Sequence, residues 1–257
     1  LKLAAGVAGG LACGPAARAQ EAGWDASGWW SCPSPEAGLA AELGRLPGDD
    51  YPSAFVHRGP RAGRRVALTF DDGPKPGNTE RVLEALARFN AKGTFFLIGQ
   101  NVRAFPKIAE MTRAAGHELA NHSYTHPKLS ALGNERVESE LTKAQEAIFD
   151  ATGFRPVMFR PPYGAFVPRQ KGMATDLGLT VVMWSVDPMD WRNRNTELVT
   201  QRVLGGTRGA GDIILTHDIH ATTVAAIPAI LEGLTERGYE MVTVSELLGG
   251  ATPPAGG

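Results

Sequence analysis

Residues 65–74 have the sequence Arg-Val-Ala-Leu-Thr-Phe-Asp-Asp-Gly-Pro, and this stretch decides the fold class. A short apolar run, residues 66–70, ends directly in two aspartates and a Gly-Pro pair. Such a run, bounded by turn residues, is typical of a buried strand that enters a loop. The segment that follows, residues 79–90, has apolar side chains at helical spacing, so we expect a helix there.

The same order of strand and then helix repeats through the rest of the chain. Further strands are expected at residues 94–98, 118–120, 157–159, 180–184, 213–215 and 241–244, and helices at 104–115, 135–151, 169–176, 196–204 and 224–237. This alternation favours a parallel sheet covered by helices, so the predicted fold is α/β with about seven parallel strands. Periodicity does not separate an open sheet from a closed barrel, but in both the functional site lies at the C-terminal ends of the strands.

The start of the chain has the features of a secretion signal peptide over residues 1–19. Lys2 supplies a positive charge, an apolar stretch follows it, and Ala17-Arg18-Ala19 fits a small-x-small cleavage site. A disordered Ala/Gly tail is the alternative. Cys13 is a weak candidate for lipidation, and after cleavage Cys32 would have no partner for a disulfide. The leader predicts a secreted or periplasmic protein.

Composition divides the remaining chain into three parts. We expect an extension or linker at residues 20–64, which contain Trp24, Trp29 and Trp30, then a catalytic domain at 65–248 and a flexible tail at 249–257. A formal net charge of -1 argues against nucleic acid as a partner. The apolar run of the leader is too short to span a membrane. We expect a monomer.

Polar side chains follow several of the predicted strands at the point where each strand ends. Asp71 and Asp72 follow the first, and His122 and His126 follow the third. A His-x-x-x-His pair can direct both imidazoles at one point if the segment turns like a helix. Two histidines and one aspartate would make a catalytic zinc site, with the other aspartate free to act as a base. Turn-forming aspartates and surface histidines are the simpler explanation of each pair alone.

Three later strand ends add further candidates. Arg160, in Arg-Pro-Pro-Tyr-Gly, can pair with a carboxylate. His217, in Leu-Thr-His-Asp, is a candidate general acid that a carboxylate such as Asp190 could orient. A histidine at a strand end is more often merely hydrogen-bonded, so each fragment carries little weight by itself.

Taken together and in order, these fragments resemble the polysaccharide deacetylases, carbohydrate esterase family 4 (CE4), with the nodulation-type deacetylase domain. The match runs from about residue 65 to residue 248 and comprises five motifs, at residues 69–74 (TFDDGP), 122–126 (HSYTH), 160–164 (RPPYG), 187–191 (DPMDW) and 215–217 (LTH). The resemblance implies a distorted (β/α) barrel with fewer strands than the usual eight.

The resemblance also implies a role for each motif residue. It makes Asp71 the catalytic base held by Arg160, and it makes His217 the acid tuned by Asp190. The metal ligands would be Asp72, His122 and His126. Tyr163 would stabilise the oxyanion through its backbone N–H, and Trp191 and Leu215 would wall the pocket for the acetyl methyl group.

The implied activity is removal of acetyl groups from N-acetylglucosamine residues of a polysaccharide, peptidoglycan or chitin-type, by a divalent metal. Zinc is the expected ion, and cobalt or another divalent ion is an alternative. An O-acetyl esterase acting on xylan and an inactive carbohydrate-binding relative are the other functions considered. Two histidines and a carboxylate can also hold iron for oxygen activation, but that chemistry has no use for Asp71 and His217 as base and acid.

Overall fold

A computed structural model describes residues 55–249, and these form an α/β fold built on one parallel sheet. The strands are β1 (Arg65–Asp71), β2 (Gly93–Leu97), β3 (Glu118–Asn121), β4 (Met158–Phe159), β5 (Thr180–Val181), β6 (Ile213–His217) and β7 (Glu240–Met241). The α-helices are α2 (Thr79–Arg88), α3 (Gly99–Ala104), α4 (Pro106–Ala114), α5 (Asn134–Thr152), α6 (Pro168–Asp176), α7 (Thr196–Gly206), α8 (Ala221–Glu236) and α9 (Val244–Leu247). Two short 3-10 helices, Leu129–Ala131 and Pro162–Gly164, lie in loops.

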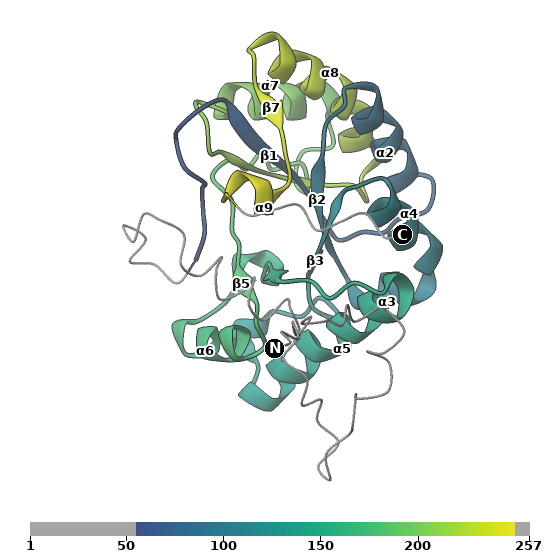
Figure 1. Ribbon diagram of the computed structural model, residues 1–257, viewed down its shortest axis with the longest axis vertical. Coiled ribbons are helices and arrows are strands. Elements are labelled where there is room, and N and C mark those ends of the chain that lie inside the picture. The colour runs from purple at the N-terminus through teal and green to yellow at the C-terminus, as the bar shows by residue number, and fades with distance from the viewer. Residues whose placement is uncertain (1–54, 250–257) are drawn as a thin grey trace, which may run out of the picture.

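The sheet has the strand order β5-β4-β3-β2-β1-β6, with β7 pairing β1, and every pairing is parallel. Its two end strands are joined by the segment before β1. Val56 forms a bridge with Val182, next to β5, and Arg58 forms one with Asp212, next to β6. The sheet is therefore curled, and the predicted seven-stranded distorted barrel is confirmed (Figure 1).

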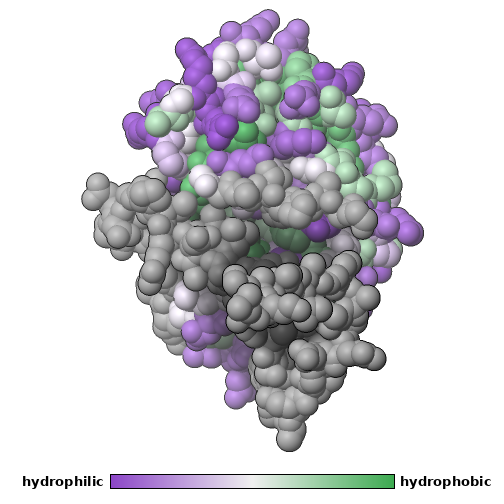
Figure 2. All heavy atoms as spheres, in the orientation of Figure 1, coloured by the Kyte–Doolittle hydropathy of each residue, from purple (hydrophilic) through white to green (hydrophobic). Residues whose placement is uncertain are grey.

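The two faces of the sheet pack against different parts of the chain. Val66, Leu68 and Phe70 of β1 pack in the core beneath the outer helices, among them α2 and α8. Ala67 faces the other way and packs in a second cluster with Phe96 and the residues of α9. This alternation follows from the two-residue period of a strand. Figure 1 shows α9 lying across the sheet, and Figure 2 shows hydrophilic side chains along the outer helices at the top of the same view.

Two segments differ from the sequence prediction. The helix expected at residues 104–115 is α4, which begins two residues later because Pro106 is its N1 residue, and the helix before it, α3, was not predicted. The strand expected at 241–244 ends at Met241, and α9 follows, because Thr243 and Glu246 form a capping box at its start.

Several sequence predictions fall outside the described residues. The leader, Cys13, Cys32, the three tryptophans of the extension and the tail beyond residue 249 stay predictions. The structure does show residues 55–64 against the sheet, which the sequence assigned to the extension. No helix among residues 55–249 has the length and apolar character to cross a membrane.

Candidate active site

Asp71, the last residue of β1, is held by a guanidinium group from inside the barrel. Arg160 Nη1 donates to Asp71 Oδ1 at 2.6 Å and to Thr69 Oγ1 at 2.8 Å. Its Nε and Nη2 donate to the carbonyl oxygens of Val182 and Met183, and its guanidinium stacks on the ring of Phe96. Both Arg160 and Asp71 are buried, so the orientation of the Asp71 carboxylate is fixed before any substrate binds.

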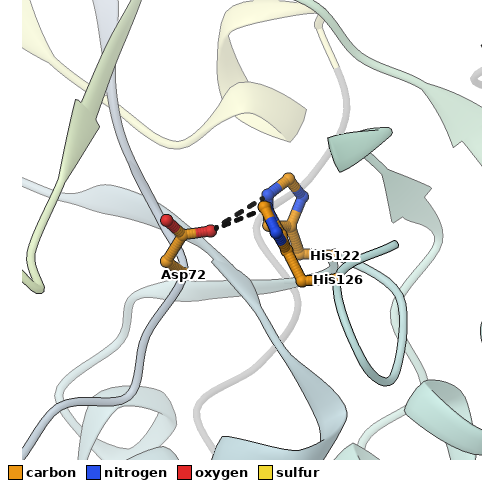
Figure 3. A group of neighbouring side chains, drawn as sticks. All are labelled: Asp72, His122 and His126. Carbon is orange, nitrogen blue, oxygen red and sulfur yellow. Dashed lines mark ion pairs between the residues drawn. The ribbon is translucent and has the colours of Figure 1, made fainter. Parts of the chain in front are cut away.

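The Asp72 side chain points toward two histidines on the loop after β3 (Figure 3). Its Oδ1 lies 3.4 Å from Nε2 of His122 and 3.1 Å from Nε2 of His126 (Figure 3). The backbone at Asp72 is left-handed, with φ 75°. Within residues 55–249, these three side chains are the one group of three or more histidine, cysteine or acidic residues placed to hold a metal.

The two histidines are brought together by an irregular loop and not by the helical turn that the sequence predicted. Ser123 and His126 both have left-handed backbones, with φ 64° and 59°. Ser123 Oγ accepts a hydrogen bond from the His126 N–H, which closes the loop on itself. The ring centroids of His122 and His126 lie 5.0 Å apart as a result.

The protonation pattern of the cluster fits a metal cation. Nδ1 of His122 lies 2.7 Å from the carbonyl oxygen of Arg160, which can only accept, so Nδ1 carries the proton. The lone pair of Nε2 then faces Asp72 Oδ1, a buried oxygen with no donor among the described residues. Two acceptors facing each other repel unless a cation lies between them.

The charge of Asp72 supports the same conclusion. Burial raises the pKa of Asp72, but hydrogen bonds from the His122 and His126 rings when these carry a proton on Nε2, together with the charge of His217, lower it by more, so the net pKa lies well below the usual range. The carboxylate is therefore ionised. Two histidines and one carboxylate leave coordination positions open for water and substrate, as catalytic sites require.

His217, at the end of β6, is held in its charged form by a second buried carboxylate. Its Nδ1 lies 2.8 Å from Asp190 Oδ1, and Asp190 Oδ2 accepts from the backbone N–H of His217 and from Thr223 Oγ1. Burial lowers the pKa of His217, but Asp190 more than offsets this and raises it to about 9. The ring therefore holds a proton at neutral pH, as a general acid must.

The sheet register brings the two halves of the site together. β1 and β6 are neighbours, and their pairing sets Asp71 directly beside His217. Asp71 Oδ2 also lies 3.7 Å from Nε2 of His122. A carboxylate and a protonated imidazole thus stand on adjacent strand ends, next to the Asp72 cluster.

The three predicted substrate-binding residues occupy different settings. Tyr163 is 69% exposed, and its ring meets the edge of His126 at 4.7 Å between centroids. Trp191 is half exposed, directly after Asp190, whereas Leu215 is buried on β6 two residues before His217. Tyr163 and Trp191 can reach a substrate in solution, while Leu215 can only line a pocket wall.

Some residues around the site had no assigned role in the sequence analysis. Asp218 is buried, accepts a hydrogen bond from Thr79 Oγ1, and packs so closely on Gly73 that an added Cβ would lie 2.9 Å from its oxygens. Burial raises its pKa to about 7. It ties the end of β6 to the loop that carries Asp72. Thr69, which also bonds Arg160, could have been assigned to the site from the sequence alone. A polar residue two positions before Asp71 lies on the same face of the strand.

Comparison with known proteins agrees with this geometry. The polysaccharide deacetylase family model matches residues 58–182. A solved structure, the Bc1960 peptidoglycan N-acetylglucosamine deacetylase in complex with 4-naphthalen-1-yl-N-oxidanyl-benzamide, is 33% identical with a TM-score of 0.74, over 78% of this chain and 95% of that one. The chain belongs to the polysaccharide deacetylase family.

Curated members of the polysaccharide deacetylase family extend the comparison. The peptidoglycan-N-acetylglucosamine deacetylase PgdA of Listeria monocytogenes is 43% identical over 74% of this chain. The peptidoglycan-N-acetylmuramic acid deacetylase PdaC of Bacillus subtilis is 37% identical over 71% of it. The matched regions cover only 40% and 38% of those two proteins, so the chain spans about two fifths of their length.

The polysaccharide deacetylase fold is also shared by a protein described as inactive. BA3943, a CE4 family pseudoenzyme from Bacillus anthracis, is 32% identical with a TM-score of 0.73, over 78% of this chain and 70% of that one. Fold similarity alone therefore does not carry activity. The placement of the predicted acid and base residues says more about activity than the fold does; these residues are Asp71, Arg160, Asp190 and His217.

Proposed function

We propose that this polysaccharide deacetylase hydrolyses the N-acetyl group of N-acetylglucosamine residues in peptidoglycan, releasing acetate and leaving a free amine. The observation that carries the proposal is the pairing of a fixed carboxylate, Asp71, with a protonated imidazole, His217, on neighbouring strands beside the Asp72 cluster. Amide hydrolysis needs both a base for the attacking water and an acid for the departing nitrogen.

Each group has a defined part in the proposed reaction. Asp71 Oδ2 accepts a proton from the attacking water, while Arg160 holds Oδ1. His217 donates its proton to the sugar nitrogen as the carbon–nitrogen bond breaks. Asp190 stabilises the charged imidazole until that step. The backbone N–H of Tyr163 is the proposed donor to the developing oxyanion.

Asp72, His122 and His126 are the residues that would hold the metal, and we propose zinc as the ion. When bound, a divalent metal polarises the acetyl carbonyl and lowers the pKa of water to about 7. The donor set supports this proposal, because two imidazoles and a carboxylate suit zinc.

Peptidoglycan is proposed because relatives named for it match this chain at 37–43% identity. Those two relatives differ in the sugar that their names specify, and we propose the glucosamine unit because the relative with the higher identity is named for it. The predicted leader at residues 1–19 supports a location outside the cytoplasm, where this polymer lies.

The test is acetate release from two substrates, an N-acetylglucosamine oligomer and purified peptidoglycan. The expected result is release from both, loss on adding a chelator, and recovery on adding zinc. Mass spectrometry of the muropeptides should place the lost acetyl group on glucosamine. Loss from the muramic acid residue would contradict the proposed sugar.

An esterase control separates the remaining functions. Acetylated xylan should release little acetate compared with the N-acetylated substrates. If only xylan were hydrolysed, the protein would be an O-acetyl esterase. If zinc-loaded protein bound the oligomer and released acetate from none of these glycans, it would be an inactive carbohydrate-binding relative.

A further inference from the structure

Glu140 lies on α5, outside the Asp72 cluster, and its side chain is buried. Its side chain is 3% exposed, although glutamate is seldom buried without a partner. Its neighbour in the fold is the loop at residues 122–126, which carries both histidines of the Asp72 cluster.

Both carboxylate oxygens of Glu140 are used by that loop. Oε2 accepts the backbone N–H groups of Tyr124 and Thr125, at 3.1 Å and 2.7 Å, and Oε1 accepts the hydroxyl of Thr125 at 2.9 Å. A cationic neighbour, Arg136, has a mostly exposed side chain whose Nη2 lies 3.6 Å from Glu140 Oε1. Glu140 therefore binds the two residues that immediately precede His126.

The two histidines differ in how their rings are held. His122 is fixed directly, because its Nδ1 bonds the carbonyl oxygen of Arg160 and its backbone N–H bonds Leu97. No residue in the described part of the chain hydrogen-bonds Nδ1 of His126. The position of His126 consequently depends on its left-handed backbone, which bonds Ser123 Oγ, on the edge contact with Tyr163, and on the loop segment that Glu140 holds.

We propose that Glu140 is a positioning residue for the metal site, which fixes His126 by binding the N–H groups of Tyr124 and Thr125. The inference rests on the proposed metal site and deepens it. Residues that hold metal ligands in place, without binding the metal themselves, change metal affinity by about 10- to 100-fold when they are removed. Here the restraint acts on the loop backbone instead of the imidazole ring.

The test is the zinc affinity of the full chain, measured without substrate by competition with a chromophoric chelator. Glu140→Ala should bind zinc about 10- to 100-fold more weakly than the wild type, because His126 loses its restraint. Glu140→Gln should bind nearly as tightly. Its amide oxygen can accept both backbone N–H groups, and its NH₂ group can donate to Thr125 Oγ1, which then acts as acceptor.

Two control variants separate positioning from general destabilisation. Val137→Ala opens a cavity at a fully buried position of the same helix and should lower the melting temperature while leaving zinc affinity unchanged. Glu138→Ala changes an exposed glutamate of α5 and should alter neither quantity.

Thr125→Val removes only the hydroxyl bond, so it should stay folded and weaken zinc binding less than Glu140→Ala does.

The outcomes are decisive in both directions. Weak zinc binding by Glu140→Ala, with recovery in Glu140→Gln, would support the proposal. Wild-type affinity in Glu140→Ala, equal losses in Ala and Gln variants, or an equal loss in Val137→Ala would each overturn it. Because no substrate is present, failure to release acetate in the functional assay would leave this result intact.

Discussion

The proposed reaction depends most on one property of a single residue, which is the proton carried by His217. Burial by itself would leave the imidazole neutral, and Asp190, with the more distant Asp71 and Asp72, reverses that effect. Sequence motifs named His217 and Asp190 because both follow strand ends. They could not show that Thr223 and the His217 backbone N–H also bond Asp190, since those contacts join Asp190 to residues that are far from it in the sequence.

The pH dependence of turnover follows from this pair. His217 acts in its protonated form, so kcat should fall as pH rises through about 9. Asp190→Asn removes the main cause of the raised pKa, so the fall should move to lower pH, toward the usual value of about 6.5. A pH profile of acetate release measures this. Asp187→Asn, a change at an exposed residue of the same loop, is the matched control, and a shift in it as large as that of Asp190→Asn would contradict the account.

The close packing of helices and strands against one another positions the site residues. Two helix starts that the sequence prediction misplaced or missed, those of α4 and α9, carried visible signs in Pro106 and in the Thr243–Glu246 capping box. The β-branched residues around Thr243 favour a strand, but the capping box starts a helix there instead. The contact of α3 with α5 had no such sign, because it depends on Tyr124 and Ala144, from two other segments, approaching Gly99 closely.

Gly99→Ala tests that contact. An added methyl group would lie 2.6 Å from the Tyr124 ring and 2.9 Å from the Cα of Ala144, so we expect a loss of about 1–3 kcal/mol of unfolding free energy. Urea denaturation measures it. Gly205→Ala in α7 meets nothing within 4 Å and should instead gain about 0.5–1 kcal/mol. Equal effects of the two changes would show that the packing at Gly99 is not tight.

At the scale of the whole molecule, the fold depends on a segment that the sequence placed in a linker. Seven parallel strands were predictable from the alternation of apolar runs and helical patterns. The joining of the sheet ends by residues 55–60 was not, because those residues show no strand period and pair through isolated bridges. Asp212 is central there, since it bonds Arg58, Ser185 and two backbone N–H groups.

Gly211→Ala tests whether this closure stabilises the protein. The residue has φ 83°, and an added Cβ would lie 2.4 Å from the carbonyl oxygen of Gly59. Strain and clash together should lower the unfolding free energy by about 2–4 kcal/mol, seen as a lower melting temperature. Gly209→Ala, two residues earlier and in open space, is the control. An unchanged melting temperature in Gly211→Ala would show that the closing segment contributes little.

The proposed reaction requires the metal-loaded protein to hydrolyse an acetamide with Asp71 as its base. The most direct measurement is the turnover number of Asp71→Asn on an N-acetylglucosamine oligomer, made together with the zinc content of the same sample. Asp176→Asn, an exposed change on α6, is the reference. We expect unchanged zinc content and a fall in kcat of about 10²- to 10⁴-fold. Wild-type turnover in zinc-loaded Asp71→Asn would contradict it.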